Sequence, residues 1–360
     1  MVHDAWFKID GQKKCPGLYW HGFSRVKGKP EPIDIWVCTP IYADAITADE
    51  RDESFGLLLR FVNSFGKWRE WAMPMHLLKG SGDDMRGELL RLGVRMNPDA
   101  KKHLSGWLMQ AKPKPRIIAA MRTGWHLDGR SFVLPNVTIG DKCVRFQSEY
   151  VAHDDFIQQG DVKDWRECVG LKCRGNPILI LSVSAAFAAP LLLRAKQQSA
   201  GGGGIHLVGK SSNGKTTALQ VAASVWGGHG YVRTWRATAN GLEATAAALN
   251  DSLLVLDEIS ECDPREIRTI IYALANGHGK QRAQRTGGVR ESARWRTIVL
   301  SSGERTLAAH MEESGQRIKA GQEARLLNIP AERVSGNETN LMCRRHLIIM
   351  SYWLPVVQSL

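Results

Sequence analysis

The chain has 360 residues, of which 43% are hydrophobic and 23% are charged, a globular composition long enough for two domains. This balance excludes a chain that is mainly disordered. Lysine and arginine number 48 against 36 aspartate and glutamate, and the net charge of +12 favours a polyanionic partner without specifying one.

The seven cysteines are an odd number and are widely scattered, and the first residues lack the apolar core of a signal peptide. We therefore expect a cytoplasmic protein. Cys168 and Cys173 are close in sequence, but no second pair of cysteines or histidines lies near them. This spacing favours ordinary thiols over a zinc site.

Short apolar runs separated by turn residues fill 18–147, as at 33–38, 57–62 and 131–134, and are typical of strands. The segments 84–92 and 101–108 have the spacing of amphipathic helices. We expect an α+β amino-terminal domain over 1–165. Its tryptophans could stack on bases, but no basic stripe interleaves with them, which favours a tryptophan-rich core: Trp68, Trp71, Trp107 and Trp125.

The segment 166–204 combines an apolar stretch with a run of four glycines. The stretch from Ile178 to Leu193 contains Ser182, Ser184 and Pro190 and is shorter than the ~20 residues of a spanning helix. It predicts a buried helix and no membrane partner. Gly201 to Gly204 predict a flexible joint, after which strands and helices alternate over 205–330.

A phosphate-binding loop follows the apolar run 205–208 and precedes a helical pattern that ends at Gly227. Its glycines allow successive backbone N–H groups to turn around phosphate oxygens at the positive end of a helix. The spacing predicts ATP bound through Lys215 and Mg²⁺ bound through the hydroxyl of Thr216. The predicted nucleotide-binding residues are Gly209, Ser211, Ser212, Asn213, Gly214, Lys215, Thr216 and Thr217.

An acidic pair, Asp257 and Glu258, follows the apolar run 252–256, which reads as a buried parallel strand. Ligands of open α/β sheets bind at the carboxyl ends of such strands. Asp257 is therefore predicted to hold Mg²⁺, and Glu258 to act as the base or orienting group for attacking water. A charge at the start of a helix is the alternative, and the loop upstream favours the functional interpretation.

Two further groups are candidates for sensing the terminal phosphate. The run 297–300 predicts a strand that ends in Ser301, Ser302 and Gly303, where a plain turn is the alternative. Arg325 suits an arginine that acts on the nucleotide of a neighbouring subunit, and a solvated arginine is an equal alternative.

Residues 277–296 contain six basic residues and one acid, Glu291. Gly287 and Gly288 suit a tight hairpin turn. A basic hairpin here predicts contact with nucleic-acid phosphates in a central pore, and a solvated loop is the alternative. The predicted nucleic-acid-binding residues are Lys280, Arg282, Arg285 and Arg290.

These motifs together resemble the family catalogued as domain of unknown function 927, which occurs in phages, plasmids and genomic islands. The resemblance rests on 209–217, Asp257 with Glu258, 275–277, 301–304 and 321–325, and upstream on 71–75, 124–126, 132–135 and 175–176. Some members are similar to hexameric AAA+ replicative helicases of the minichromosome-maintenance type. The resemblance implies an AAA+-like P-loop NTPase domain, with Lys215 and Thr216 for nucleotide, Asp257 for metal, Glu258 for hydrolysis, Ser302 as sensor and Arg325 as finger.

The expected function is that of an ATP-hydrolysing motor, a DNA helicase or translocase that forms a hexamer-type ring on single-stranded DNA. The tail 331–360 departs from the family, whose chains continue with a helical lid, and this suggests truncation or a shifted reading frame. The alternatives are a nucleotide-dependent switch or scaffold in replication that does not translocate, and an inactive prophage remnant. A small-molecule kinase is disfavoured, because no acceptor-site signature appears.

Overall fold

The computed structural model describes residues 1–9, 11–26, 29–149, 155–195, 202–280, 282–283, 289–290, 292–313, 315 and 324–331. Arg285, the Gly287–Gly288 turn and the tail from 332 lie outside these residues. The chain forms two compact units, Met1–Met121 with Pro135–His153, and Arg122–Leu134 with Asp154–Leu360. The expected boundaries at 165 and 204 differ from these, because 122–134 and the apolar helix both pack within the second unit.

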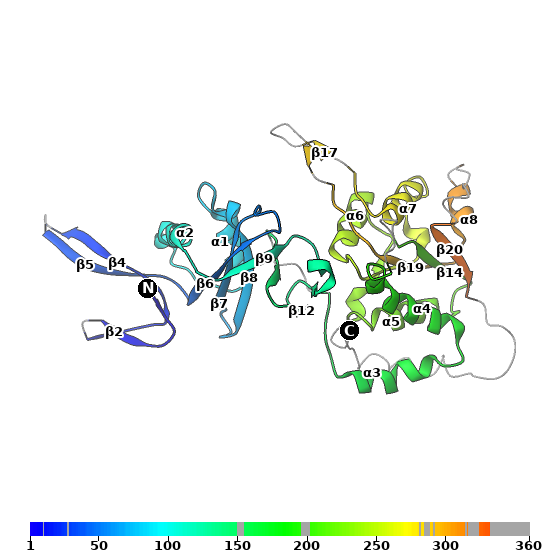
Figure 1. The fold of residues 1–360 in the computed structure, drawn as a ribbon, viewed down its shortest axis with the longest axis horizontal. Helices are drawn as coiled ribbons and strands as arrows, with labels where there is room; N and C mark the ends of the chain where they lie inside the picture. Colours follow the sequence, from blue (N-terminus) through cyan, green and yellow to red (C-terminus); the bar gives the residue numbers. More distant parts are fainter. Residues whose placement is uncertain are drawn as a thin grey trace. The chain divides into compact units, whose positions relative to one another are not determined.

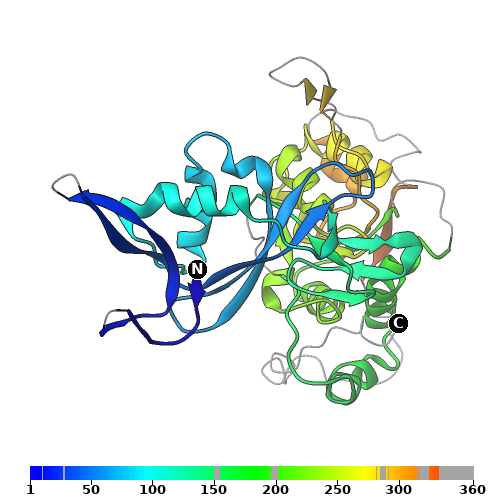
Figure 2. The same ribbon diagram turned by 60° about the vertical axis from the view of Figure 1, so that its left-hand side comes forward.

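The first unit is built on a five-stranded mixed sheet of order β13-β9-β6-β7-β8, with the β1-β4-β5 sheet and the β2-β3 hairpin beside it (Figures 1 and 2). Two helices accompany these strands. The elements of this unit are β1 (Val2–His3), β2 (Phe7–Ile9), β3 (Gln12–Lys14), β4 (Gly17–Val26), β5 (Lys29–Cys38), β6 (Ile41–Ala48), β7 (Gly56–Val62), β8 (Trp68–Pro74), α1 (Asp83–Arg91), α2 (Lys101–Gln110), β9 (Arg116–Ala120), β12 (Thr138–Gly140) and β13 (Val144–Phe146).

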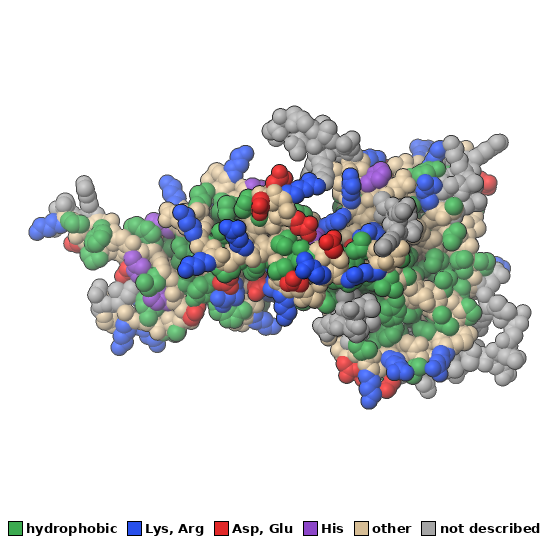
Figure 3. Space-filling view, in the orientation of Figure 1, with side chains coloured by type: hydrophobic (Ala, Val, Ile, Leu, Met, Phe, Trp, Pro, Cys, Tyr) green, Lys and Arg blue, Asp and Glu red, His purple; other side chains and the backbone are tan. Residues whose placement is uncertain are grey.

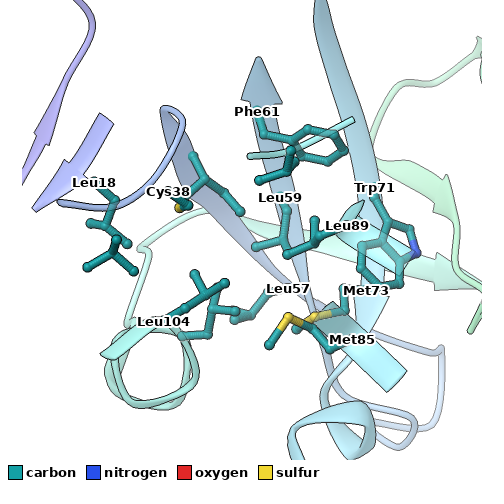
Figure 4. Close-up of a cluster of buried hydrophobic side chains, with 14 of the residues drawn as sticks. Leu18, Cys38, Leu57, Leu59, Phe61, Trp71, Met73, Met85, Leu89 and Leu104 are labelled. Atoms are coloured by element: carbon teal, nitrogen blue, oxygen red, sulfur yellow. The ribbon is translucent and has the colours of Figure 1, made fainter. Parts of the chain in front are cut away.

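The core of this unit lies between the sheet and its two helices (Figure 4). Strand alternation turns Leu57, Leu59 and Phe61 of β7 to one face, where they meet leucines and methionines spaced four apart on α1 and α2. Each fully buried side chain of this size contributes about 1.5–3 kcal/mol. Trp71 belongs to this core and Trp107 packs against it, whereas Trp68 is 47% exposed. The predicted tryptophan-rich core is therefore only partly realised.

The second unit has a five-stranded sheet of order β15-β16-β19-β14-β20, in which every pair is parallel. Helices cover both faces, α4 and α5 on one and α6 and α7 on the other (Figure 1). The elements are β10 (Gly124–His126), β11 (Ser131–Val133), α3 (Val162–Cys168), α4 (Pro177–Ala188), β14 (Gly204–Val208), α5 (Lys215–Ala223), β15 (Arg233–Thr234), α6 (Ala239–Ala248), β16 (Leu253–Asp257), α7 (Ile267–Asn276), β17 (Arg282–Ala283), β18 (Val289–Arg290), β19 (Ile298–Gly303), α8 (Leu307–Glu312) and β20 (Leu326–Pro330).

The apolar stretch forms α4, which begins where Asn176 accepts the N–H groups of Ile178 and Leu179. Its 12 residues rise about 18 Å, less than the ~30 Å of a bilayer core. Within the described residues, no helix has the length and apolarity needed to cross a membrane. Within the expected joint, Gly202 donates its N–H to Thr297 O and Gly204 already belongs to β14, while Gly201 lies outside the described residues.

The β10–β11 hairpin is fixed onto the second unit through the buried carboxylate of Asp251. One oxygen of this carboxylate accepts the N–H of Trp125 at 3.0 Å, and the other accepts Nε of Arg296 at 2.6 Å. The Trp125 indole donates to Pro190 O at 2.7 Å. Gly124 has a φ of +92°, and a Cβ there would lie 2.5 Å from the Asp251 carboxylate. Only glycine fits this close approach.

Candidate functional site

The site lies at the carboxyl edge of the parallel sheet, where β14 leads into a loop and then α5. Gly214 caps α5 with a left-handed backbone, and Ser212 is also left-handed, so the chain turns sharply between β14 and α5. The side chains of Ser211, Ser212, Asn213 and Thr216 are exposed. Backbone N–H groups at a helix start attract anions, and the loop therefore has the geometry that a phosphate group requires.

Lys215 is the first residue of α5, yet its side chain is 92% buried because it folds back beneath the loop. Its Nζ donates to the carbonyl oxygens of Gly209, at 2.6 Å, and Lys210, at 2.8 Å. These neutral carbonyls are weaker partners for an ammonium than phosphate oxygens would be. The ammonium is thus held where a bound anion could replace the carbonyls.

Asp257, at the end of β16, meets Thr216 across the intervening strand β19. The Thr216 hydroxyl lies 3.4 Å from Asp257 Oδ2. One carboxylate, one hydroxyl and the oxygens of a phosphate ligand suit Mg²⁺, which keeps several waters and takes few protein ligands. The described residues contain no cluster of three or more histidine, cysteine or acidic side chains that could hold a metal on their own.

Glu258 has a left-handed backbone, with φ of +58°, which is uncommon for a residue other than glycine and costs free energy. Its carboxylate accepts a hydrogen bond from the hydroxyl of Ser260 at 2.5 Å, and its N–H lies 3.3 Å from the hydroxyl of Ser302. This turn ends β16 and leads into a short 3-10 helix, Ile259–Glu261.

Ser302 connects the two acidic residues. Its buried hydroxyl donates to Asp257 Oδ1 and accepts the N–H of Glu258. A serine has one hydroxyl proton, and here the carboxylate takes it. Ser302 therefore fixes the orientation of Asp257 and leaves Oδ2 as the oxygen that faces Thr216. Its assignment as a phosphate sensor stays a prediction.

A second set of polar side chains, which the sequence reasoning missed, crosses the sheet beneath the site. The Trp235 indole donates to the hydroxyl of Ser301 at 2.8 Å, and this hydroxyl lies 2.9 Å from Nδ1 of His206. Nε2 of His206 lies 2.9 Å from Arg305 O. Since a carbonyl can only accept, Nε2 carries the proton, and Ser301 donates to Nδ1. The sequence feature that could have indicated this network is His206, a histidine within the otherwise apolar run 205–208.

Burial lowers the pKa of His206, because the apolar surroundings disfavour the charged ring. The hydrogen bond to Arg305 O and the charge of Glu258 oppose this shift, while His310 and Lys215 add to it. Burial likewise lowers the pKa of His310, which lies on α8 and bonds to Cys262 O at 3.0 Å. Both rings are therefore neutral at pH 7, so Nε2 of His206 donates to Arg305 O and Nδ1 of His206 accepts from Ser301.

Arg325 lies at the opposite edge of the sheet from the loop. It precedes β20, where Leu326 pairs with Gly204 at the start of β14, whereas the loop follows Val208 at the end of β14. Five residues of strand separate these edges by roughly 15 Å. The guanidinium stacks over Tyr272 at 4.8 Å. The structure thus does not bring Arg325 to the site of its own chain.

The basic segment forms the predicted hairpin, with β17 and β18 antiparallel and extending away from α6 and α7 (Figure 1). Arg282 pairs directly with Arg290 across the two strands. The root of the hairpin, where Gly279 and Lys280 lead into β17, is held by two hydrogen bonds. The N–H of Gly279 donates to Ala293 O at 2.8 Å, and the N–H of Lys280 donates to the carboxylate of Glu243 at 3.2 Å. Lys280 is exposed at the root.

Comparison with solved structures relates this fold to a structure described as SCCmec type IV Cch, active helicase. The TM-score is 0.66 at 21% identity, and the match covers 94% of this chain and 64% of that chain. At this identity the likeness concerns the fold, and this chain spans less than two thirds of the other. Two further structures score too low to indicate a shared fold. The apo NrS-1 C-terminal region has a TM-score of 0.33 at 10% identity, and the match covers 80% of this chain and 59% of that chain. NtrX from Brucella abortus in complex with ATP has a TM-score of 0.27 at 16% identity, and the match covers 47% of this chain and 42% of that chain.

Comparison with curated proteins gave no match. A family model described as Domain of unknown function (DUF927) matches residues 7–294, which include the loop, Asp257, Glu258 and most of the basic segment. Ser302 and Arg325 lie beyond the matched residues. Since the match spans most of both structural units, the chain belongs to the Domain of unknown function (DUF927) family.

Proposed function

We propose that this chain binds ATP with Mg²⁺ at the carboxyl edge of its parallel sheet and hydrolyses it to move along single-stranded DNA. The observation that carries the proposal is the convergence of two distant parts of the chain: the start of α5, with the buried Lys215 ammonium and the Thr216 hydroxyl, and the end of β16, with the Asp257 carboxylate. These are the groups that a P-loop ATPase of the AAA+ type places around the terminal phosphates.

Each residue has a distinct role in this proposal. The loop from Gly209 to Thr217 holds the phosphates through backbone N–H groups, and Lys215 exchanges its carbonyl partners for phosphate oxygens. Thr216 and Asp257 would hold Mg²⁺, which would supply neutralising charge at the phosphates. Glu258 orients the attacking water and accepts its proton. Ser302 keeps Asp257 in the orientation that Thr216 requires.

The nucleic-acid part of the proposal rests on the hairpin and on the fold. Lys280, Arg282 and Arg290 lie along a ribbon that projects from the second unit, and the excess of basic residues suits a phosphate backbone. The fold is similar to that of a protein described as an active helicase. We expect a ring of six subunits. In such a ring Arg325 would contact the terminal phosphate bound by a neighbouring subunit, since it lies far from the loop of its own chain.

The test separates nucleotide binding from hydrolysis by titrating a fluorescent ATP analogue and measuring phosphate release. Lys215→Ala should weaken ATP binding by at least about 100-fold, because it removes a charge-assisted contact in a buried site. Glu258→Gln should retain binding and lower turnover by about 10²–10⁴-fold. Lys210→Ala, in the same loop with an exposed side chain, is the matched control and should retain both.

Wild-type turnover in Lys215→Ala or in Glu258→Gln would contradict the proposed site. Tight ATP binding by the wild type with no turnover under any condition would point instead to a nucleotide-dependent switch.

A further inference from the structure

The β2–β3 hairpin of the first unit places two lysines directly opposite each other. Lys8 pairs with Lys13 in the antiparallel register, so both side chains leave the same face, and both are exposed. Like charges at directly opposite positions destabilise a two-stranded ribbon. Lys14 is adjacent and bonds to Gln12 at 3.2 Å. Within the described residues, none of the three lysines forms an ion pair with a carboxylate.

An exposed aromatic ring lies beside this positive pair. Trp6 is 61% exposed, and the ammonium of Lys13 is 4.7 Å from its ring centroid. Burial of such a large apolar ring would be favourable, and nothing in its own unit covers most of it. A flat ring next to uncompensated cations is the combination that binds single-stranded nucleic acid, by stacking of a base and pairing of phosphates.

The hairpin is held in place from its other face, so this surface has a fixed position within the first unit. Phe7 stacks on His3 with a centroid distance of 3.7 Å and meets the buried Tyr19 of β4 edge-on at 5.2 Å. Strand alternation turns Lys8 away from this aromatic packing. Figure 3 shows lysine and arginine side chains beside hydrophobic ones on the hairpins that extend from this unit.

The hairpin in the second unit repeats the arrangement, because Arg282 stands directly opposite Arg290 there. The β2–β3 ribbon thus carries a cross-strand pair of like cations, a local conflict that an external polyanion would relieve. Natural sequences accept such conflicts mainly at functional sites.

We infer that Trp6, Lys8 and Lys13 form a second contact for single-stranded nucleic acid, in which the indole stacks on a base and the two lysines bind flanking phosphates. This surface gives the first unit a role in substrate binding and rests on the proposed nucleic-acid function. Its occupancy requires no ATP, because none of its residues belongs to the nucleotide site.

Photocrosslinking tests the contact directly. A single-stranded oligothymidylate with 5-iododeoxyuridine substitutions, irradiated with the full chain in the absence of nucleotide, should crosslink to the tryptic peptide Met1–Lys8 through Trp6. Trp6→Leu should abolish this crosslink. Trp68→Leu is the matched control, since Trp68 is similarly exposed and also has a cation over its ring, but that cation, Arg60, is paired with Asp44. The control should leave the crosslink intact.

Fluorescence anisotropy with the same oligonucleotide at several salt concentrations measures the contribution of the lysines to binding affinity. Lys8→Ala and Lys13→Ala should each reduce the salt dependence of log Kd by about 0.7, as expected for one phosphate contact on a single strand. Trp6→Leu should weaken binding about tenfold with little change in that slope. Lys79→Ala, an exposed lysine elsewhere in the first unit, should change neither.

Equal losses in Lys79→Ala or Trp68→Leu, or crosslinks outside Met1–Lys8 only, would overturn the inference. So would binding of the hairpin to anionic phospholipid vesicles, abolished by Trp6→Leu, while oligonucleotide affinity stays unchanged. Because these assays contain no ATP, an inactive ATPase that still crosslinks at Trp6 would refute the motor proposal and leave this contact standing.

Discussion

The two carboxylate oxygens of Asp257 have different partners, and this difference organises the site. Oδ1 accepts the hydroxyl proton of Ser302, while Oδ2 faces Thr216 at 3.4 Å. A carboxylate held in this way presents one oxygen to a cation without rotating. The side chain is therefore already ordered in the folded protein, and a cation would not have to restrict its rotation on binding. Within the proposed function, we therefore expect Ser302 to support the Mg²⁺ ligand Asp257 rather than to contact the terminal phosphate.

Ser302→Ala should therefore raise the Mg²⁺ concentration needed for half-maximal ATPase activity by about tenfold, because a supporting hydrogen bond to a metal ligand is lost. Activity is measured against Mg²⁺ at saturating ATP. Ser301→Ala, on the opposite face of the same strand, is the control. It should lower stability by removing the acceptor of Trp235, yet leave the Mg²⁺ requirement unchanged. The same Mg²⁺ requirement in Ser302→Ala and wild type would refute this role.

The pH dependence of stability follows from the buried histidines. The pKa values of His206 and His310 are lowered by burial, so near and below pH 6.5 the unfolded chain binds protons that the folded chain does not. At higher pH both rings are neutral in both states and contribute nothing to pH dependence. The free energy of unfolding should thus fall as the pH drops from 7.5 to 5.5, by up to about 1.4 kcal/mol per unit for each ring.

Urea unfolding at these pH values, for wild type and His206→Gln, measures the contribution of one ring. His206→Gln should be less stable at pH 7.5, because its amide cannot reproduce both hydrogen bonds, but its stability should depend less on pH. An equal or steeper pH dependence in the variant would show that His206 is not the titrating group.

At the residue scale, the sequence predicted the groups with local signatures. Lys215, Thr216 and Asp257 lie in motifs whose spacing carries their chemistry, and the structure places the Thr216 hydroxyl 3.4 Å from Asp257, while their roles stay predictions. The network of Trp235, Ser301 and His206 was not predictable, because Ser301 is 66 positions from Trp235 and 95 from His206, and the motif that contains Ser301 includes neither of them. Only the register of β14 against β19 places His206 opposite Ser301.

The position of the loop among the elements depends on strand order. β19 lies between β14 and β16, so the loop and Asp257 end up two strands apart, roughly 10 Å. The start of α5 nevertheless brings the Thr216 hydroxyl within 3.4 Å of Asp257 Oδ2. Alternating strands and helices predicted a parallel sheet, but their order within it could not be read from periodicity.

The β10–β11 hairpin explains why the chain has Gly124 next to Trp125. Gly124→Ala should lower the free energy of unfolding by more than about 2 kcal/mol, because the new Cβ would meet the buried Asp251 carboxylate and the backbone is left-handed. Chemical denaturation checks this value. Gly241→Ala in α6, where a Cβ would make only ordinary contacts, is the control and should be neutral or stabilise by up to about 1 kcal/mol.

A small effect of Gly124→Ala, similar to that of Gly241→Ala, would show that the hairpin is not held as described. This contact could not be predicted from the sequence, since Gly124 and Asp251 are distant in the chain and only folding brings them together.

For the whole molecule, the division into units was the least predictable feature. The four-glycine run suggested a boundary, yet these residues lead directly into β14, and the chain instead crosses between the units near residues 122, 134 and 154. Composition cannot report a segment that leaves one unit, contributes a hairpin to the other and returns. The parallel sheet with its covering helices was predicted correctly, because its strands are near-continuous apolar runs.

The placement of Arg325 predicts cooperation between copies. Lys215→Ala and Arg325→Ala should each be inactive alone, but mixing them should restore up to about a quarter of wild-type turnover, since a quarter of randomly formed interfaces pair an intact loop with an intact arginine. Turnover of the mixed and separate variants checks this. Full activity of Arg325→Ala alone, or an inactive mixture that does assemble, would show that the arginine serves no neighbour.

The central claim, an ATPase coupled to single-stranded DNA, is tested most directly by the rate of ATP hydrolysis with and without a single-stranded oligonucleotide. We predict that the oligonucleotide raises wild-type turnover several-fold, and that Lys280→Ala combined with Arg282→Ala removes this stimulation while retaining basal hydrolysis. Basal hydrolysis that single-stranded DNA leaves unchanged in the wild type, over a range of salt concentrations, would contradict it.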